Sequence, residues 1–246
     1  MHEPEFDKFA DEYYAMHNAS IGASGEGPEF FAEYKIKDLA AEYAKFNPQA
    51  PSDPCILDFG AGSGGSVPHM RTYFPQARLT CVDVSPRSLK LAQSRFPEAA
   101  EYVKFDGKAL PFETASFDVV FAACVFHHID HGQHETVLRE WSRVLRPKGM
   151  ALIYEHNPFN PLTRRVVSSC EFDANAHLIT ASAMRASMKS AGFPQAQIRY
   201  RVFFPRALRH LRPLEGRLTW LPLGAQYYVI AVASSNTHVH NHTHAR

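Results

Sequence analysis

The segment that most constrains this chain is a short apolar strand that leads directly into a glycine-rich turn. Residues 56–65 have the sequence Ile-Leu-Asp-Phe-Gly-Ala-Gly-Ser-Gly-Gly, with four glycines in the last six positions. Without side chains, these positions let the backbone turn sharply and approach a ligand closely, and a following helix would present unpaired N–H groups. The segment therefore predicts a strand–turn–helix unit that holds a nucleotide-like ligand.

Short apolar runs alternate with polar helical segments after the prolines at 48, 51 and 54, which is typical of a parallel α/β sheet. The predicted strands are Cys55–Phe59, Arg78–Val82, Tyr102–Phe105, Phe117–Phe121 and Met150–Tyr154. The predicted helices are Val67–Phe74, Pro86–Phe96 and Glu135–Leu145, the last ended by Pro147 and Gly149.

The two ends of the chain differ from this central pattern. Residues 1–50 carry aromatic residues at helical spacing and predict an N-terminal helical cap, followed by a domain over residues 51–233. Gln197–Phe204 and Tyr227–Val232 predict an antiparallel pair of strands at the sheet edge. Residues 234–246 are rich in histidine and predict a disordered tail rather than a metal site.

Composition excludes several function classes. The 26 basic and 25 acidic residues give a net charge of +1, so nucleic acid is not an expected partner. No run of about 18 apolar residues predicts a membrane span, and the N-terminus does not resemble a signal peptide, so we expect a cytoplasmic protein. The four cysteines form no CxxC pair, which argues against a disulfide or a structural zinc site. The oligomeric state is not indicated.

The glycine turn alone does not identify its nucleotide, because Gly60, Gly62 and Gly65 also satisfy the dinucleotide pattern GxGxxG. Asp58 shifts the balance, since a carboxylate two residues before the first glycine would repel a pyrophosphate and suits a cationic or amino-bearing ligand. Asp83 ends the second predicted strand and could accept hydrogen bonds from a ribose diol of either nucleotide.

Five segments in order resemble the class I S-adenosylmethionine-dependent methyltransferases, in their small-molecule branch. They are Asp58–Gly64, Asp83, Asp106–Phe112, Ser116–Val120 and Arg143–Gly149. The resemblance implies a Rossmann-like sheet of seven strands, mostly parallel with an antiparallel last strand, with helices on both faces. It also implies S-adenosylmethionine bound at the carboxyl ends of the first strands. The cofactor-binding candidates are Asp58, Gly60, Ala61, Gly62, Gly64, Asp83, Val84, Asp106, Gly107 and Cys124.

Histidines follow the fourth predicted strand, where they would border such a pocket. Methyl transfer to a hydroxyl needs alignment and a base, and histidine ordinarily titrates near neutrality. We therefore expect His128 as the base, with His127, Glu155 and His156 as further catalytic candidates; packing or hydrogen-bonding roles for these residues stay open. The substrate-binding candidates are Asn157, Arg164, Arg165 and Tyr14.

The stretch from Glu155 to Thr163, with residues 24–26 and 31–35, resembles a bacterial subgroup associated with glycan biosynthesis and suggests a sugar hydroxyl as acceptor. Two other functions stay open. An NAD(P)-dependent oxidoreductase is disfavoured by Asp58, by the Asp106 segment and by the lack of a suitably placed Tyr-x-x-x-Lys pair. A protein that binds S-adenosylmethionine without turnover would differ only in an obstructed pocket.

Overall fold

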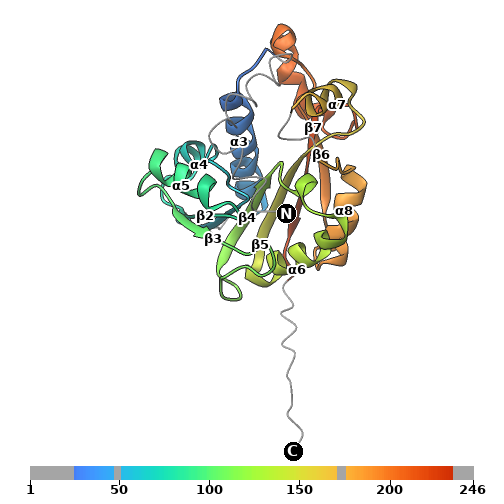
Figure 1. Cartoon of the computed structure of the whole chain (residues 1–246). Helices are drawn as coiled ribbons and strands as arrows, with labels where there is room; N and C mark the ends of the chain where they lie inside the picture. Colours follow the sequence, from blue (N-terminus) through green and yellow to red (C-terminus); the bar gives the residue numbers. More distant parts are fainter. Residues whose placement is uncertain (1–24, 47–50, 171–175, 235–246) are drawn as a thin grey trace, which may run out of the picture.

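The computed structural model describes residues 25–46, 51–170 and 176–234. Seven strands form one sheet in the order β3-β2-β1-β4-β5-β7-β6 (Figure 1). They are β1 (Cys55–Phe59), β2 (Arg78–Asp83), β3 (Glu101–Lys104), β4 (Phe117–Ala123), β5 (Leu145–His156), β6 (Gln197–Arg201) and β7 (Gln226–Val232). Neighbouring strands from β3 to β5 pair in parallel, whereas β7 is antiparallel to both β5 and β6. The Rossmann-like fold expected from the sequence is confirmed.

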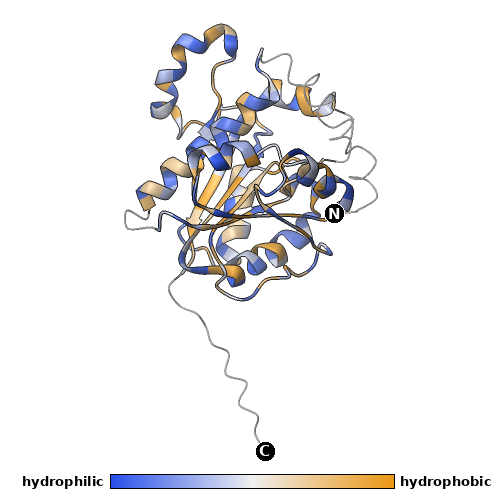
Figure 2. Ribbon diagram, turned by 90° about the vertical axis from the view of Figure 1, so that its left-hand side faces the viewer, coloured by the Kyte–Doolittle hydropathy of each residue, from blue (hydrophilic) through white to orange (hydrophobic). Residues whose placement is uncertain are grey.

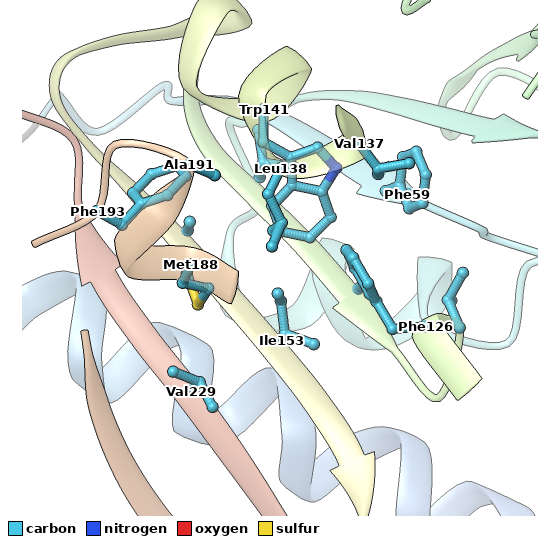
Figure 3. Packing of buried hydrophobic residues seen from close by; sticks show 14 of the residues in the cluster. Phe59, Phe126, Val137, Leu138, Trp141, Ile153, Met188, Ala191, Phe193 and Val229 are labelled. Atoms are coloured by element: carbon cyan, nitrogen blue, oxygen red, sulfur yellow. The ribbon is translucent and has the colours of Figure 1, made fainter. Parts of the chain in front are cut away.

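Helices cover both faces of the sheet because successive strand residues point to opposite sides. The pairs Ile56/Leu57 and Leu152/Ile153 each contribute one residue to either core. One core lies under α3 (Pro28–Phe46) and α4 (Val67–Tyr73), and the other lies under α6 (His134–Val144) and α8 (Ala181–Ser190). In the second core Trp141 packs against Phe59 and Phe126 (Figure 3).

The remaining helices lie between and beyond these layers. They are α5 (Pro86–Arg95), α7 (Pro161–Ser168) and α9 (Glu215–Leu218), together with the short 3-10 segments η2 (Phe126–His128), η3 (His131–Gln133) and η5 (Arg206–Leu214). Side-chain oxygens of Ser85, Asn160 and Thr180 accept backbone N–H groups at the starts of α5, α7 and α8. Such N-caps fix where each helix begins.

The largest difference from the predicted elements concerns β5. The sequence predicted a break at Pro147 and Gly149, yet the strand begins at Leu145 and its pairing with β4 is irregular between Phe117 and Val119. Lys148 takes a left-handed backbone conformation with φ of 66°, which absorbs the irregularity within the strand. The antiparallel pair is present, but β7 lies inside the sheet and β6 alone forms that edge.

The expected N-terminal cap is described only from Gly25 onward, where α3 is fastened to the sheet. The carboxylate of Asp38 accepts hydrogen bonds from Arg201 at 2.6 and 2.9 Å, and the Tyr228 hydroxyl donates to Glu42 at 2.7 Å. Ile36 and Leu39 are fully buried. Helix α3 is therefore part of the core, and the proposed boundary between a cap and the domain stays a prediction.

None of the helices in the described part of the chain combines the length and apolarity needed to cross a membrane. The cytoplasmic location remains a prediction. The histidine-rich tail from residue 235 and the candidate Tyr14 lie outside the described residues.

Candidate active site

A pocket of about 410 Å³ lies at the carboxyl ends of β1, β2 and β4. Its floor is the glycine loop after β1, and α3 forms the opposite wall through Phe31, Ala32 and Lys35. The segment that follows β4 closes one side with Cys124, Val125 and His128. The carboxyl edge of the first strands is where the sequence placed the ligand.

Backbone geometry favours glycine at three positions of the loop. Gly60, Gly62 and Gly64 have φ values of 72°, 53° and 79°, in the left-handed region that favours glycine. A Cβ atom on Gly60 would lie 2.5 Å from Val125 Cγ2, whereas one on Gly62 would meet nothing within 4 Å. Gly60 is thus required by packing, and Gly62 keeps open space above the loop.

The structure differs from the sequence prediction at two glycines of the loop, in which of them lines the pocket. Gly64 was a cofactor-binding candidate, but it is buried against α5, where a Cβ would lie 3.0 Å from Ala92. It does not line the pocket, so its role is to let the loop approach α5. Gly65 was not a candidate, yet it lines the pocket, and a Cβ atom added to it would meet nothing within 4 Å.

Two carboxylates flank the loop. Asp83 accepts a hydrogen bond from the Gly62 N–H at 2.8 Å and from the Ser85 N–H at 2.9 Å, so it orders the loop as well as facing the pocket. Asp58 is almost fully buried and accepts a hydrogen bond from the Ser66 hydroxyl. Burial, with a smaller contribution from Asp83, raises the pKa of Asp58 to about 6 despite that hydrogen bond.

The other cofactor-binding candidates occupy different places. Ala61 and Cys124 line the pocket, whereas Val84, Asp106 and Gly107 are not among its lining residues. Asp106 is exposed, and its carboxylate accepts the N–H groups of Lys108 and Ala109 at 2.9 and 3.2 Å. In this structure Asp106 therefore shapes the turn after β3.

A buried ion pair organises the segment after β4. His127 Nδ1 lies 2.6 Å from Glu155 Oε2, and Glu155 Oε1 accepts the N–H groups of Val125 and Phe126 at 3.1 and 2.7 Å. His127 and Glu155 are 1% and 0% exposed and neither lines the pocket. His128 does line it, with its ring centroid 4.2 Å from that of His127. Of the four catalytic candidates, only His128 faces the pocket.

Cys124 belongs to a polar cluster that the sequence did not reveal. Its thiol accepts a hydrogen bond from Lys35 Nζ at 3.4 Å, and Gln226 Nε2 lies 3.8 Å away. Gln226 also contacts His156 Nδ1 at 3.4 Å. Burial raises the pKa of the Cys124 thiol, but the Lys35 ammonium and His156 outweigh it and bring that pKa down to about 7.

The substrate-binding candidates after β5 lie away from the pocket. Asn157 is fully buried, and its amide donates to the carbonyls of Pro222 and Gly224 at 3.0 and 2.8 Å. Arg164 and Arg165 are exposed on α7 and do not line the pocket. Asn157 therefore ties two loops together, and neither arginine contributes to the lining of this pocket.

Residues 57–153 match the family model of the methyltransferase domain. The chain is 32% identical over 132 residues to demethylmenaquinone methyltransferase of Chlorobaculum parvum, which covers 52% of this chain and 52% of that protein. It is 34% identical over 150 residues to malonyl-[acyl-carrier protein] O-methyltransferase of Herminiimonas arsenicoxydans, covering 61% of this chain and 52% of that protein. The chain thus spans about half the length of the curated relatives it matches.

Solved structures agree on the fold. A SAM-dependent methyltransferase from Thermotoga maritima superposes with a TM-score of 0.64 at 18% identity, covering 95% of this chain and all of that one. Phosphoethanolamine N-methyltransferase 2 of Haemonchus contortus, solved with S-adenosyl-L-methionine, gives 0.57 at 20% identity over 83% of this chain and 56% of that one. Residues 57–153 of the chain therefore form a methyltransferase domain, and its fold is the one found in S-adenosylmethionine-dependent methyltransferases. In this methyltransferase domain, the resemblance drawn from five sequence segments is confirmed.

Proposed function

We propose that this protein transfers a methyl group from S-adenosylmethionine to a hydroxyl of a small-molecule acceptor. The observation that carries the proposal is the pocket of a methyltransferase domain in which His128 and Lys35 share one cavity with the glycine loop. One region of the pocket can hold a nucleoside, and the other offers polar side chains to an acceptor. The names of the relatives, which concern demethylmenaquinone and a malonyl carrier protein, support a non-nucleic-acid acceptor.

The residues present suit this cofactor. Open space above Gly62 and Gly65 leaves room for a ligand against the loop, and Asp83 can accept hydrogen bonds from a diol. Asp58 disfavours a pyrophosphate beside the loop and favours a ligand that carries positive charge. When bound, the cofactor supplies an electrophilic methyl group on a sulfonium.

The protein's own part in the reaction is alignment, exclusion of water and removal of one proton. His128 is the proposed base, because it faces the pocket while the buried His127–Glu155 pair fixes the backbone that carries it. Lys35 lies on the same pocket and can stabilise an oxyanion that forms when a hydroxyl loses its proton. The proposal of a sugar hydroxyl as the acceptor comes from the sequence resemblance of residues 155–163, 24–26 and 31–35.

The test combines binding and turnover. We expect S-adenosylhomocysteine to raise the melting temperature and NAD to leave it unchanged, because a ligand of the native state stabilises it by mass action. Labelled S-adenosylmethionine and a panel of sugar, quinol and carboxylic-acid acceptors then identify the acceptor class. Stabilisation by NAD alone would overturn the cofactor assignment, and binding without transfer to any acceptor would favour a non-catalytic protein.

His128→Ala should lower turnover of the identified acceptor by about 10²–10⁴-fold and leave the affinity for S-adenosylhomocysteine nearly unchanged. His131→Ala is the matched control, because His131 is an exposed histidine of the same segment and does not line the pocket. Equal turnover in the two variants would remove His128 from the role of base.

A further inference from the structure

The large exposed apolar side chains of the described residues are gathered on two segments. Among the described residues, the large hydrophobic side chains with high exposure are Phe159, Leu162, Leu208, Leu214, Trp220 and Leu223. Trp220 is 72% exposed and Phe159 is 66% exposed. All six belong to residues 157–165 and 206–223, which we call the apical surface.

Hydrogen bonds hold the two segments against each other. Asn160 Nδ2 donates to the Leu223 carbonyl at 2.9 Å, and Asn157 Nδ2 donates to the Pro222 carbonyl at 3.0 Å. Just beyond the second segment, the Ala225 carbonyl accepts a hydrogen bond from the Thr163 hydroxyl at 2.8 Å. Phe159, Leu162 and Leu223 therefore belong to one continuous part of the molecule.

The apical surface also carries a concentrated positive charge. Its two segments contain six arginines and one glutamate, in a chain whose total net charge is +1. The glutamate is Glu215, which is buried and accepts the N–H groups of Phe203 and Phe204 at 3.1 Å. Arg164, Arg165, Arg206, Arg209 and Arg217 are exposed.

The shape of the apical surface is a projection. In Figure 1 the orange segment of η5 and α9 stands at the top of the molecule, at the same end as α7. Figure 2 shows hydrophilic and hydrophobic residues alternating along the ribbon at that end. Apolar side chains on a projection can enter a second, apolar medium directly, and a fluid medium adapts to their shape without a matching groove.

We propose that the apical surface binds an anionic lipid bilayer, with its arginines on headgroup phosphates and Trp220, Phe159, Leu162 and Leu223 at the boundary of the acyl chains. Exposed aromatic and aliphatic side chains, in two segments that also carry exposed arginines, satisfy both requirements of interfacial binding, apolar insertion and attraction to negative headgroups.

The apical surface adjoins the pocket. Arg212 pairs with Glu26 at 2.7 Å and lies 4.5 Å from the centroid of the Phe30 ring, and Arg206 donates to the Gly25 carbonyl at 3.1 Å. Pro28 and Glu29, which lie close in sequence to Gly25, Glu26 and Phe30, line the pocket. Docking on a bilayer would therefore place the N-terminal end of α3 beside the lipid headgroups.

Fluorescence of the full chain tests the insertion directly. The two tryptophans are Trp141, which is fully buried, and Trp220, which is exposed, so a blue shift on adding vesicles reports Trp220. We expect the shift with phosphatidylcholine vesicles that contain phosphatidylglycerol, a much smaller shift with phosphatidylcholine alone, and reversal by high salt. Trp220→Ser should weaken sedimentation with the anionic vesicles by about tenfold or more.

A matched pair of charge reversals tests the arginines. The double variant R209E/R217E changes two exposed arginines of the apical surface and should lower vesicle partitioning by about 25-fold or more, since each basic residue contributes about fivefold. The control R185E/K189E makes the same charge change on exposed residues of α8 and should partition as the wild type does. Equal loss in both double variants would show a non-specific charge effect and overturn the proposal.

Three further results would also overturn it. One is the absence of sedimentation with anionic vesicles at low salt, and another is sedimentation without a Trp220 blue shift. The third is the use of this surface for a protein contact while vesicles stay unbound. Such a contact would be recognised as a dimer in light scattering that Trp220→Ser dissociates, or as binding to an acidic protein. Because none of these measurements depends on methyl transfer, their outcome is independent of the proposed function.

Discussion

The Nδ1 atom of His127 lies 2.6 Å from Oε2 of Glu155, and both side chains are shielded from solvent. This pair joins the end of β5 to the segment after β4, because the second oxygen of Glu155 accepts two backbone N–H groups there. Glu155 thereby positions the chain that carries His128 and Cys124 without facing the pocket itself.

Replacing Glu155 with Ala should reduce the free energy of unfolding by about 3–5 kcal/mol, because a buried partner and two buried N–H groups lose their acceptor. Glu135→Ala removes an exposed carboxylate that pairs with Arg139 on α6. This control should change the free energy of unfolding by less than about 1 kcal/mol. Urea unfolding measures both. A similar small change in both variants would contradict the structural role of Glu155.

The same ion pair predicts a pH dependence. Burial raises the pKa of Glu155, but His127 and the backbone N–H donors outweigh it, so the net pKa is lowered. A carboxyl with a lowered folded-state pKa stabilises the protein above its unfolded-state pKa, which is about 4.3, and this contribution is lost as the pH falls. The difference in unfolding free energy between wild type and Glu155→Gln should therefore shrink in acid. A difference that grows below that pH would contradict the prediction.

Asp58 should behave in the opposite sense. Its pKa is raised to about 6 from an ordinary value of about 4, so the ionised carboxylate costs stability as the pH rises through this interval. Asp58→Asn keeps an acceptor for the Ser66 hydroxyl and should raise the unfolding free energy at pH 8 by about 1–3 kcal/mol, with no gain near pH 4. Thermal unfolding at the two pH values measures this, and S-adenosylhomocysteine should stabilise the variant less than the wild type. If Asp58→Asn is less stable than the wild type at pH 8, the buried Asp58 carboxylate does not destabilise the folded protein and the prediction is wrong.

Cys124 should be the most reactive of the described cysteines. Its thiol pKa of about 7 predicts that alkylation by iodoacetamide rises with pH around neutrality, whereas Cys55, Cys81 and Cys170 are buried. Peptide mass spectrometry follows each site. Lys35→Met should move the alkylation profile to higher pH, and S-adenosylhomocysteine should slow the reaction because Cys124 lines the pocket. Alkylation that is insensitive to both would contradict the Lys35–Cys124 contact.

The glycine loop offers a matched pair of substitutions. Gly60→Ala should destabilise the protein by about 2 kcal/mol or more, since φ is 72° and its Cβ would lie 2.5 Å from Val125 Cγ2. Gly65→Ala should fold as the wild type does, because nothing lies within 4 Å of its Cβ position, yet the methyl group would enter the pocket. Chemical unfolding and calorimetry with S-adenosylhomocysteine separate the two effects. Equal stability of both variants would contradict the predicted role of Gly60.

The elements that were predicted best are those whose bounds are set by the residues immediately before and after them. The predicted and observed bounds of the strand Cys55–Phe59 are identical, because Pro54 and Gly60 mark the two ends of this largely apolar run. Helix α8 was not predicted, because its sequence ASAMRASMKS shows only a weak apolar stripe and its start depends on the Thr180 cap. Strand β5 extends through Pro147 because pairing with β4 outweighs the local preference for a turn.

The candidate site divides in the same way. Asp58 and Asp83, near the ends of β1 and β2, and Gly62 in the loop were predicted to face the ligand, and they line the pocket because the order of strands and turns along the chain sets their position. Lys35 could not, since it meets Cys124 across 89 positions of sequence. Asn157 was assigned to substrate because polar residues after a strand suggest a site, but its amide is consumed by the carbonyls of a distant loop.

Helix α3 places Phe31 and Lys35 on the pocket while Ile36 and Leu39 are locked in the core beneath it. This wall cannot swing aside without exposing Ile36 and Leu39, so we expect the buried part of α3 to be rigid before any ligand arrives. Little ordering entropy is then lost there on binding, and discrimination between acceptors depends on the static fit of a preformed surface. Any substitution on α3 that changes the acceptor preference must therefore also preserve the packing of this helix against the sheet.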